Sequence, residues 1–151
     1  MKDEKHYILQ FGEKAIIIYS LDNKFYAKLQ HQPEDCHYCG YIDKDLLITS
    51  SWNGYVHIWN LENTSFVKSI KVGDNLTLLY ILKWNDKFAI VAACHKKSIY
   101  IIDMEQYKVI CQICTNHEKV VKCVKKYVHP IYGESLISAS YDRSLKIWSV
   151  K

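Results

Sequence analysis

Cysteine and histidine are the residue types in this chain that could carry out metal or redox chemistry. Two Cys-x-x-Cys pairs, Cys36/Cys39 and Cys111/Cys114, have a spacing found in zinc sites and in thiol-disulfide centres. Both pairs fall in segments with strand patterns, where residues three apart point to opposite faces, so neither pair converges on one metal without a bulge. Reduced thiols buried or half-buried in strands are the preferred interpretation, and we expect no metal and no cofactor.

Four of the seven histidines are candidates for catalysis beside Asp45 or Asp86, namely His37, His57, His95 and His129. No nucleophile elbow, phosphate-binding glycine-rich loop, His-Glu-x-x-His motif or paired-carboxylate motif accompanies them. Histidines scattered in this way belong mostly to turns and surfaces. Catalysis therefore has no positive support, and we expect a protein that is not an enzyme.

Composition and charge exclude several classes of protein. The 151 residues are 49% apolar, enough for an ordinary core, and carry a formal charge of +4 that comes from scattered lysines and arginines. A scattered charge is more typical of solvated strand faces than of a nucleic-acid surface. No segment is long and apolar enough for a membrane span, and no apolar run follows residues 1–5. We expect an intracellular protein, in the cytoplasm or the nucleus, without a membrane partner.

The elements that position these residues are predicted to be strands throughout. Residues 15–19 are apolar on both faces, as in an interior strand, whereas residues 144–148 alternate as a half-exposed strand does. Only residues 118–128 place valines at helix-like spacing, and because β-branched residues dominate there we expect a strand. The predicted fold class is all-β.

A hairpin pattern recurs along the chain. Residues 46–59 match residues 135–148 position for position, with Asn53 six residues before Trp59 as Asp142 is six before Trp148. Aromatic or apolar anchors end the third strand of each cycle at spacings of 40, 43 and 46 residues: Tyr19, Trp59, Ile102 and Trp148. A period of this length with about four strands per cycle is typical of a β-propeller blade.

On these residues the chain resembles the WD-repeat (Trp-Asp repeat) β-propeller family over nearly its whole length. In that family four side chains of a repeat form a hydrogen-bonded tetrad. The resemblance carries the tetrad to His117, Ser138 or alternatively Ser140, Asp142 and Trp148 in the last repeat. These polar groups would satisfy one another inside the protein, so the implied role is structural and not catalytic.

The earlier repeats depart from the family pattern. The second repeat keeps His31, Thr49 and Trp59 but has Asn53 in place of the aspartate, which removes the charge and keeps an acceptor. In the third repeat the tetrad is lost, and Ala92, Lys96 and Ile102 stand at three of its positions. The chain is therefore interpreted as a divergent member.

The predicted architecture is a partial propeller of four-stranded antiparallel blades, with two full blades flanked by two partial ones. The expected boundaries are a partial blade at 1–30, blades at 31–71 and 72–114, and a partial blade at 115–151. Propellers typically need four to eight blades. We therefore expect either the C-terminal half of a larger propeller or a half-propeller that closes its ring with a second copy or another half-propeller.

The function implied by the resemblance is a non-catalytic protein-protein interaction scaffold. Its candidate partner-binding rim consists of Trp52, His95, Lys96, Lys97, Tyr141 and Arg143. Exposed Trp, Tyr and Arg are the side chains that most often anchor interfaces, although Trp52 and Tyr141 could instead cover the edges of their own blades. The alternative function is an RNA-associated propeller that uses the basic and aromatic residues of this rim.

Overall fold

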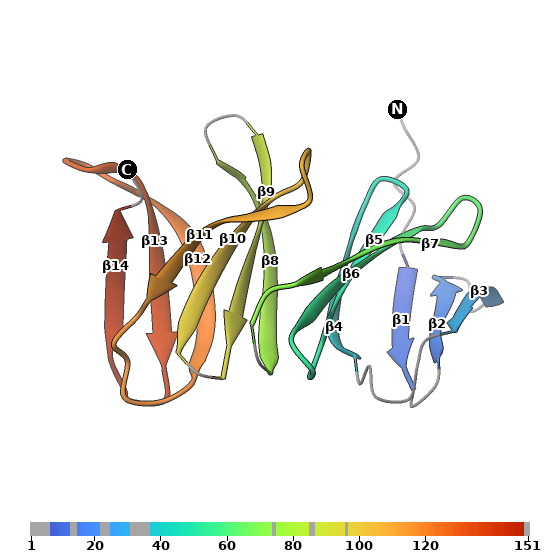
Figure 1. The fold of residues 1–151 in the computed structure, drawn as a ribbon, viewed down its shortest axis with the longest axis horizontal. Helices are drawn as coiled ribbons and strands as arrows, with labels where there is room; N and C mark the ends of the chain where they lie inside the picture. Colours follow the sequence, from blue (N-terminus) through green and yellow to red (C-terminus); the bar gives the residue numbers. More distant parts are fainter. Residues whose placement is uncertain are drawn as a thin grey trace.

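A computed structural model describes residues 7–12, 15–21, 25–30, 37–73, 75–84, 87–95 and 97–149. All regular elements in these residues are β-strands, arranged as sheets that stand side by side (Figure 1). Within the same residues no helix is present that could cross a membrane.

In the described residues, fourteen strands form four antiparallel sheets in chain order. Sheet A contains β1 (Tyr7–Phe11), β2 (Ala15–Ser20) and β3 (Phe25–Gln30). Sheet B contains β4 (His37–Asp43), β5 (Leu46–Ser51), β6 (Tyr55–Asn60) and β7 (Ser65–Lys71). Sheet C contains β8 (Leu76–Trp84), β9 (Lys87–Cys94), β10 (Ser98–Asp103) and β11 (Lys108–Cys114). Sheet D contains β12 (Val121–His129), β13 (Gly133–Ser140) and β14 (Leu145–Ser149).

Each strand pairs with the next one in its sheet, so every sheet is a simple meander. The three, four, four and three strands of the sheets match the number that the sequence pattern predicts. The predicted fold class, an all-β partial propeller with four-stranded sheets flanked by three-stranded ones, is confirmed.

Backbone preferences of single residues explain where two of the strands lie. Residues 118–128 do not form a helix; the strand β12 occupies Val121–His129, as expected for β-branched residues. Tyr107 has a φ of 53° and lies in the turn before β11. A left-handed residue cannot continue a strand ladder, so β11 begins one residue later.

The described residues form three apolar core clusters, and each joins two neighbouring sheets. One cluster packs Ile18 of sheet A against Trp59 of sheet B, and the next packs Ile58 of sheet B against Ile102 of sheet C. Trp59 and Ile58 are adjacent in sequence and point to opposite faces, which is the alternation that a strand imposes. Apolar residues on both faces of β6 are therefore explained, because sheet B is covered on both sides.

Close packing between sheets A and B also explains one glycine. A Cβ atom added at Gly40 would lie 2.9 Å from the Phe11 ring and 3.2 Å from Leu9. Strands β1 and β4 approach each other here, so any side chain at this position would force them apart.

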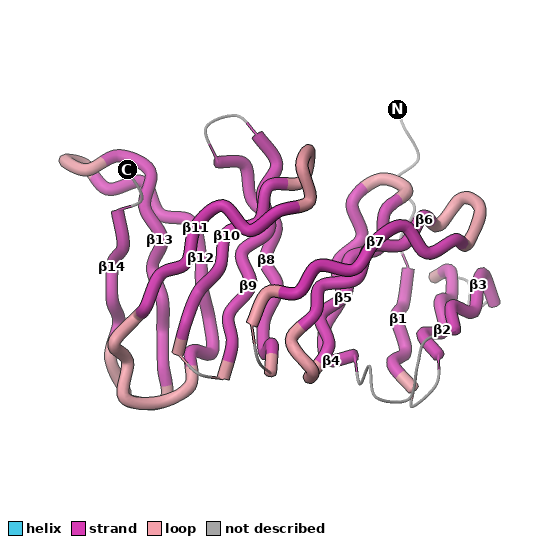
Figure 2. Tube along the Cα trace, in the orientation of Figure 1, coloured by secondary structure: helices cyan, strands magenta, loops and turns pink. Residues whose placement is uncertain are grey.

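One edge of the molecule gathers turns from sheets B, C and D, and we call it the rim (Figure 2). The rim contains the β5–β6, β9–β10 and β13–β14 turns together with the β7–β8 and β11–β12 loops. Backbone hydrogen bonds tie turns to loops: Val72 N–H donates to Gly54 O at 3.0 Å, and Thr115 N–H donates to Lys97 O at 3.1 Å. The rim therefore has a defined backbone shape on which side chains are displayed.

Candidate interaction rim and its polar tetrad

A chain of hydrogen bonds links four side chains of the last repeat. The Trp148 Nε1–H donates to Ser138 Oγ at 2.9 Å, and Ser138 Oγ lies 2.8 Å from His117 Nε2. The other ring nitrogen, His117 Nδ1, lies 2.8 Å from Asp142 Oδ2. With a ring proton on Nδ1, the imidazole donates to the carboxylate and accepts from the Ser138 hydroxyl at Nε2; Nδ1 also lies 3.0 Å from Ser144 Oγ.

The carboxylate of Asp142 is the most connected group of this network. It accepts hydrogen bonds from the Ser144 hydroxyl at 2.6 Å, the Ser144 N–H at 2.9 Å and the Glu118 N–H at 2.9 Å, besides His117. These contacts, led by the Ser144 hydroxyl, hold the pKa of Asp142 well below its usual range. The carboxylate therefore fastens the β13–β14 turn to the β11–β12 loop.

The structure distinguishes between the two serines that the sequence left open. Ser138 is 1% exposed and bridges His117 and Trp148. The Ser140 hydroxyl instead donates to Lys119 O at 2.9 Å and accepts from Asp142 N–H at 3.2 Å. Ser140 thus links the β11–β12 loop to the β13–β14 turn, whereas Ser138 connects His117 to Trp148 within the tetrad.

In its described residues, the second repeat has a counterpart of the hydrogen bond between Trp148 and Ser138, whereas its turn residue Asn53 has a local partner. Trp59 Nε1–H donates to Thr49 Oγ1 at 3.2 Å, as Trp148 donates to Ser138. Asn53 accepts a short hydrogen bond from the Ser51 hydroxyl, which lies 3.3 Å from His57 Nε2. His31, the remaining predicted member, lies outside the described residues.

The third repeat has an apolar core in place of the tetrad. Ala92 and Ile102 are both 0% exposed and belong to the cluster between sheets B and C. Apolar side chains of suitable size can replace a buried polar network without loss of stability, provided that no polar group is left unpaired. The loss expected at these positions is therefore compatible with a packed sheet.

Several structural polar residues were not predicted from the sequence. Ser144 is one, and the residues that directly follow two anchors are others: Asn60 Oδ1 accepts from Glu62 N–H at 2.9 Å, and Asp103 Oδ1 accepts from Glu105 N–H at 2.7 Å. Both are Asx turns that lead into the outer strand of a sheet. An Asn or Asp at the start of a predicted turn is the sequence signal that could have indicated them.

Among the described residues, the groups considered for metal or catalytic chemistry form no metal site, although two of the histidines adjoin each other. No three His, Cys, Asp or Glu side chains there could hold one metal ion. Cys111 is half-buried and Cys114 is exposed, three residues apart on β11. His37 and His57 are buried side by side, with ring centroids 5.0 Å apart, whereas His129 stacks on Tyr132 at 4.6 Å.

Two aromatic patches occupy the rim. Trp52 is 42% exposed, and its ring lies 6.1 Å from that of His95, so this pair spans the turns of sheets B and C. Tyr141 is 63% exposed, with Lys122 Nζ 4.6 Å from its ring centroid. Each ring is therefore open to solvent and has a second ring or a cation beside it.

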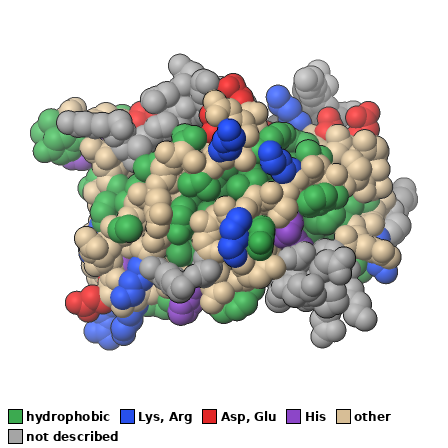
Figure 3. Space-filling view, in the orientation of Figure 1, with side chains coloured by type: hydrophobic (Ala, Val, Ile, Leu, Met, Phe, Trp, Pro, Cys, Tyr) green, Lys and Arg blue, Asp and Glu red, His purple; other side chains and the backbone are tan. Residues whose placement is uncertain are grey.

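The basic residues predicted for the rim are placed as follows. Arg143 is exposed at the tip of the β13–β14 turn with a φ of 67°, and Lys97 is exposed at the β9–β10 turn with a φ of 70°. Lys96 lies outside the described residues. Figure 3 shows lysines and arginines spread over one face of the molecule and not gathered into a block.

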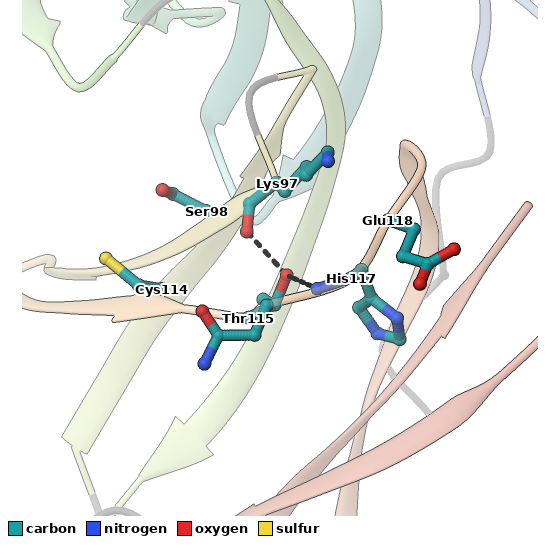
Figure 4. Close-up of a pocket in the computed structure, with 7 residues that line it drawn as sticks. Lys97, Ser98, Cys114, Thr115, His117 and Glu118 are labelled. Atoms are coloured by element: carbon teal, nitrogen blue, oxygen red, sulfur yellow. Dashed lines mark hydrogen bonds between the residues drawn. The ribbon is translucent and has the colours of Figure 1, made fainter. Parts of the chain in front are cut away.

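A hollow of about 430 Å³ opens on the rim between the β9–β10 turn and the β11–β12 loop. Its lining includes Lys97, Cys114, Asn116 and Glu118, and therefore offers both charges and an amide (Figure 4). Thr115 lines it as well, and its hydroxyl donates to Lys97 O at 2.5 Å. The rim thus combines exposed aromatic rings with a polar depression.

Comparison with known proteins confirms the resemblance to WD-repeat proteins. Residues 108–149 match the family model described as WD domain, G-beta repeat, and this segment contains the complete tetrad. WD40 repeats generally serve as protein-interaction scaffolds and are typically non-catalytic.

Solved structures support the same fold. The computationally designed Ika8 protein is similar with a TM-score of 0.76 at 13% identity, over 97% of this chain and 44% of that one. The computationally designed Ika4 protein is similar with a TM-score of 0.76 at 14% identity, over 98% of this chain and 88% of that one. These designed proteins are β-propeller-like, and the chain spans less than half the length of Ika8.

Proposed function

We propose that this chain is a non-catalytic scaffold that binds other proteins through its rim. The observation that carries the proposal is the pair of exposed aromatic patches, Trp52 with His95 and Tyr141 with Lys122, on the edge where the turns gather. Aromatic rings held by neighbours lose little conformational entropy when a partner covers them, which favours binding.

The polar tetrad supports this proposal as a positioning device. His117 and Asp142 fix the β13–β14 turn, whose tip carries Tyr141 and Arg143. A turn held in one conformation presents the same surface to every partner, so less ordering free energy is lost on binding. The tetrad is thus proposed to act on binding only through the shape of the rim.

We further propose that the four sheets correspond to blades at 1–30, 31–71, 72–114 and 115–151, and that a second copy completes the ring. Propeller blades leave apolar faces exposed unless another blade covers them. Self-association would therefore accompany partner binding in the functional protein.

The test compares partner binding by the wild-type chain with that by Trp52→Ala and Tyr141→Ala variants. Proteins retained from cell extract are identified, and the same proteins are then measured with purified chain. Each rim substitution is expected to reduce retention at least tenfold without lowering the melting temperature, whereas Ile110→Ala on the outer strand β11, where Ile110 is 55% exposed, is expected to change nothing.

Two outcomes would contradict the proposal. One is loss of folding in the rim variants, which would mean that the two rings cover their own sheets. The other is RNA, retained with steep dependence on salt, as the main bound molecule, because phosphate contacts release counterions.

A further inference from the structure

The contacts between sheets follow one repeated rule. In every sheet two cross-strand pairs, on opposite faces, join the same two neighbouring strands. The pairs that face the following sheet, called the forward pairs, are Leu9/Ile18, Ile48/Ile58, Val91/Ile101 and Ile137/Ile147. The pairs that face the preceding sheet, called the backward pairs, are Ile8/Tyr19, Leu47/Trp59, Ile90/Ile102 and Leu136/Trp148.

At each junction the forward pair of one sheet packs with the backward pair of the next. The cluster between sheets A and B contains Leu9/Ile18 and Leu47/Trp59. The cluster between sheets B and C contains Ile48/Ile58 and Ile90/Ile102, and the cluster between sheets C and D contains Val91/Ile101 and Leu136/Trp148. One kind of interface is therefore used three times within the chain.

The two remaining pairs have no sheet against them in the part of the chain that the structure describes. Ile147 of the last forward pair is 50% exposed, and its neighbour on the same face, Leu145, is 69% exposed. Ile8 of the first backward pair is 46% exposed. Their counterparts Ile58 and Leu47 inside the chain are both 0% exposed, so the open pairs differ from the closed ones in coverage and not in residue type.

These two open faces lie at opposite ends of the row of sheets. Sheet D, with β14, is at one end in Figure 1, and sheet A, with β2 and β3, is at the other. A hollow of about 410 Å³ lined by His129, Tyr132, Ile147 and Ser149 marks the open face of sheet D. An apolar face with a depression is rarely left uncovered in a soluble protein.

We propose that the forward pair of sheet D, Ile137/Ile147, docks against the backward pair of sheet A, Ile8/Tyr19, of a second copy of this chain. This inference rests on the proposed self-association and names its interface. A second copy is the occupant because the chain carries both halves of a fourth junction, built like the three that it already closes. Two copies related by a two-fold axis form this junction twice, which completes both open faces.

The two central pairs are uncharged, and each has a lysine beside it on the same face. Lys125 is the cross-strand partner of Ile137, Lys28 is that of Ile17, and both lysines are exposed. The cross-strand pairs themselves contain no charged side chain, and Gln10, the hydrogen-bond partner of Tyr19 Oη at 3.3 Å, is neutral. The proposed junction is therefore apolar at its centre, and the ammonium groups of Lys28 and Lys125 can stay in water at its margin.

The test measures the mass of the purified full chain by size-exclusion chromatography with light scattering. The expected mass is twice the chain mass of 17.8 kDa. Ile147→Glu and Ile8→Lys are each expected to give monomers, because each places a charge in both junctions of the dimer. The control Ile110→Glu, at a position 55% exposed on β11, is expected to stay dimeric.

Mixing the Ile147→Glu and Ile8→Lys variants tests the head-to-tail geometry. In a mixed dimer one junction brings the introduced carboxylate and the introduced ammonium group together, and the other junction is wild type, so mixing is expected to restore the dimer. A monomeric wild-type chain, a dimer that survives Ile8→Lys, or an open series of larger species would each overturn the proposal. Rim variants at Trp52 are expected to remain dimeric, so failure of this interface and failure of partner binding are distinguishable.

Discussion

The replacement of Ser138 by alanine tests how the tetrad contributes to stability. The hydroxyl is 1% exposed and holds two partners, His117 Nε2 at 2.8 Å and Trp148 Nε1–H at 2.9 Å. His117 is itself 1% exposed, so its acceptor nitrogen would stay dry and unpaired, whereas the half-buried Trp148 can reach water. Leaving a buried polar group without a partner costs about 1–3 kcal/mol, so we expect a loss of about 2–3 kcal/mol in the free energy of unfolding.

The assay is urea unfolding followed by circular dichroism, with a thermal scan beside it. For a chain of this size the expected loss corresponds to a decrease of about 5–10 °C in melting temperature. Ser140→Ala is the matched control on the same strand; its hydroxyl bonds to Lys119 O and Asp142 N–H at the surface, and we expect a cost of about 1 kcal/mol or less. A cost for Ser138→Ala no larger than that for Ser140→Ala would contradict the expected loss of a buried hydrogen-bond partner.

Three further predictions concern charge, thiol reactivity and packing. Because hydrogen bonds lower the pKa of Asp142 in the folded protein, the stability it contributes is present above its unfolded pKa of about 3.9 and is lost as pH falls below that value; the difference in melting temperature between wild type and Asp142→Asn should therefore shrink between pH 7 and pH 3, and a constant difference would contradict this. In timed alkylation with mass spectrometry, the exposed Cys114 should react first and Cys94, which is 1% exposed, only after unfolding; equal rates would count against the packing between sheets B and C. Leu47→Ala should cost about 2–4 kcal/mol in urea unfolding because Leu47 is 0% exposed between sheets A and B, and a cost below about 1 kcal/mol would mean that these sheets are not packed together.

The strands were predictable because their sequence patterns depend on neighbours that repeat. Ile58 and Trp59 are both apolar although adjacent, which indicates a strand covered on both faces, and the structure has sheet A on one side and sheet C on the other. The turn positions were also predictable from Asn53 and Asp142 at equal distances from their anchors. The strands and turns that recur in each repeat could thus be predicted from the sequence.

The details of the polar contacts could not be predicted in the same way. Ser138 and Ser140 are two residues apart and share a strand face, so alternation cannot distinguish them; only their distances from Trp148 and His117 do. The partner of Asn53 was also hidden, because its local contact with the Ser51 hydroxyl depends on turn geometry. Side-chain contacts of this kind depend on backbone positions within a few tenths of an ångström.

From the sequence alone, the proposed interface between copies could be expected only because too few blades are present to close a ring. The sequence indicated too few blades for a ring, but the pairing of Ile137 with Ile147 and of Ile8 with Tyr19 requires the strand register. A shift of one residue would exchange the forward and backward faces of a sheet.

Site-specific crosslinking tests most directly whether the rim binds protein partners. A photoreactive amino acid is placed at Tyr141 on the rim, where exposure is 63%, and in a second variant at Ile110 on β11, where exposure is 55%. In cells, the rim position is expected to crosslink to discrete protein partners that the β11 position does not capture. Crosslinks from Ile110 alone, or the same partners from both positions, would contradict the proposal that the rim is the binding surface.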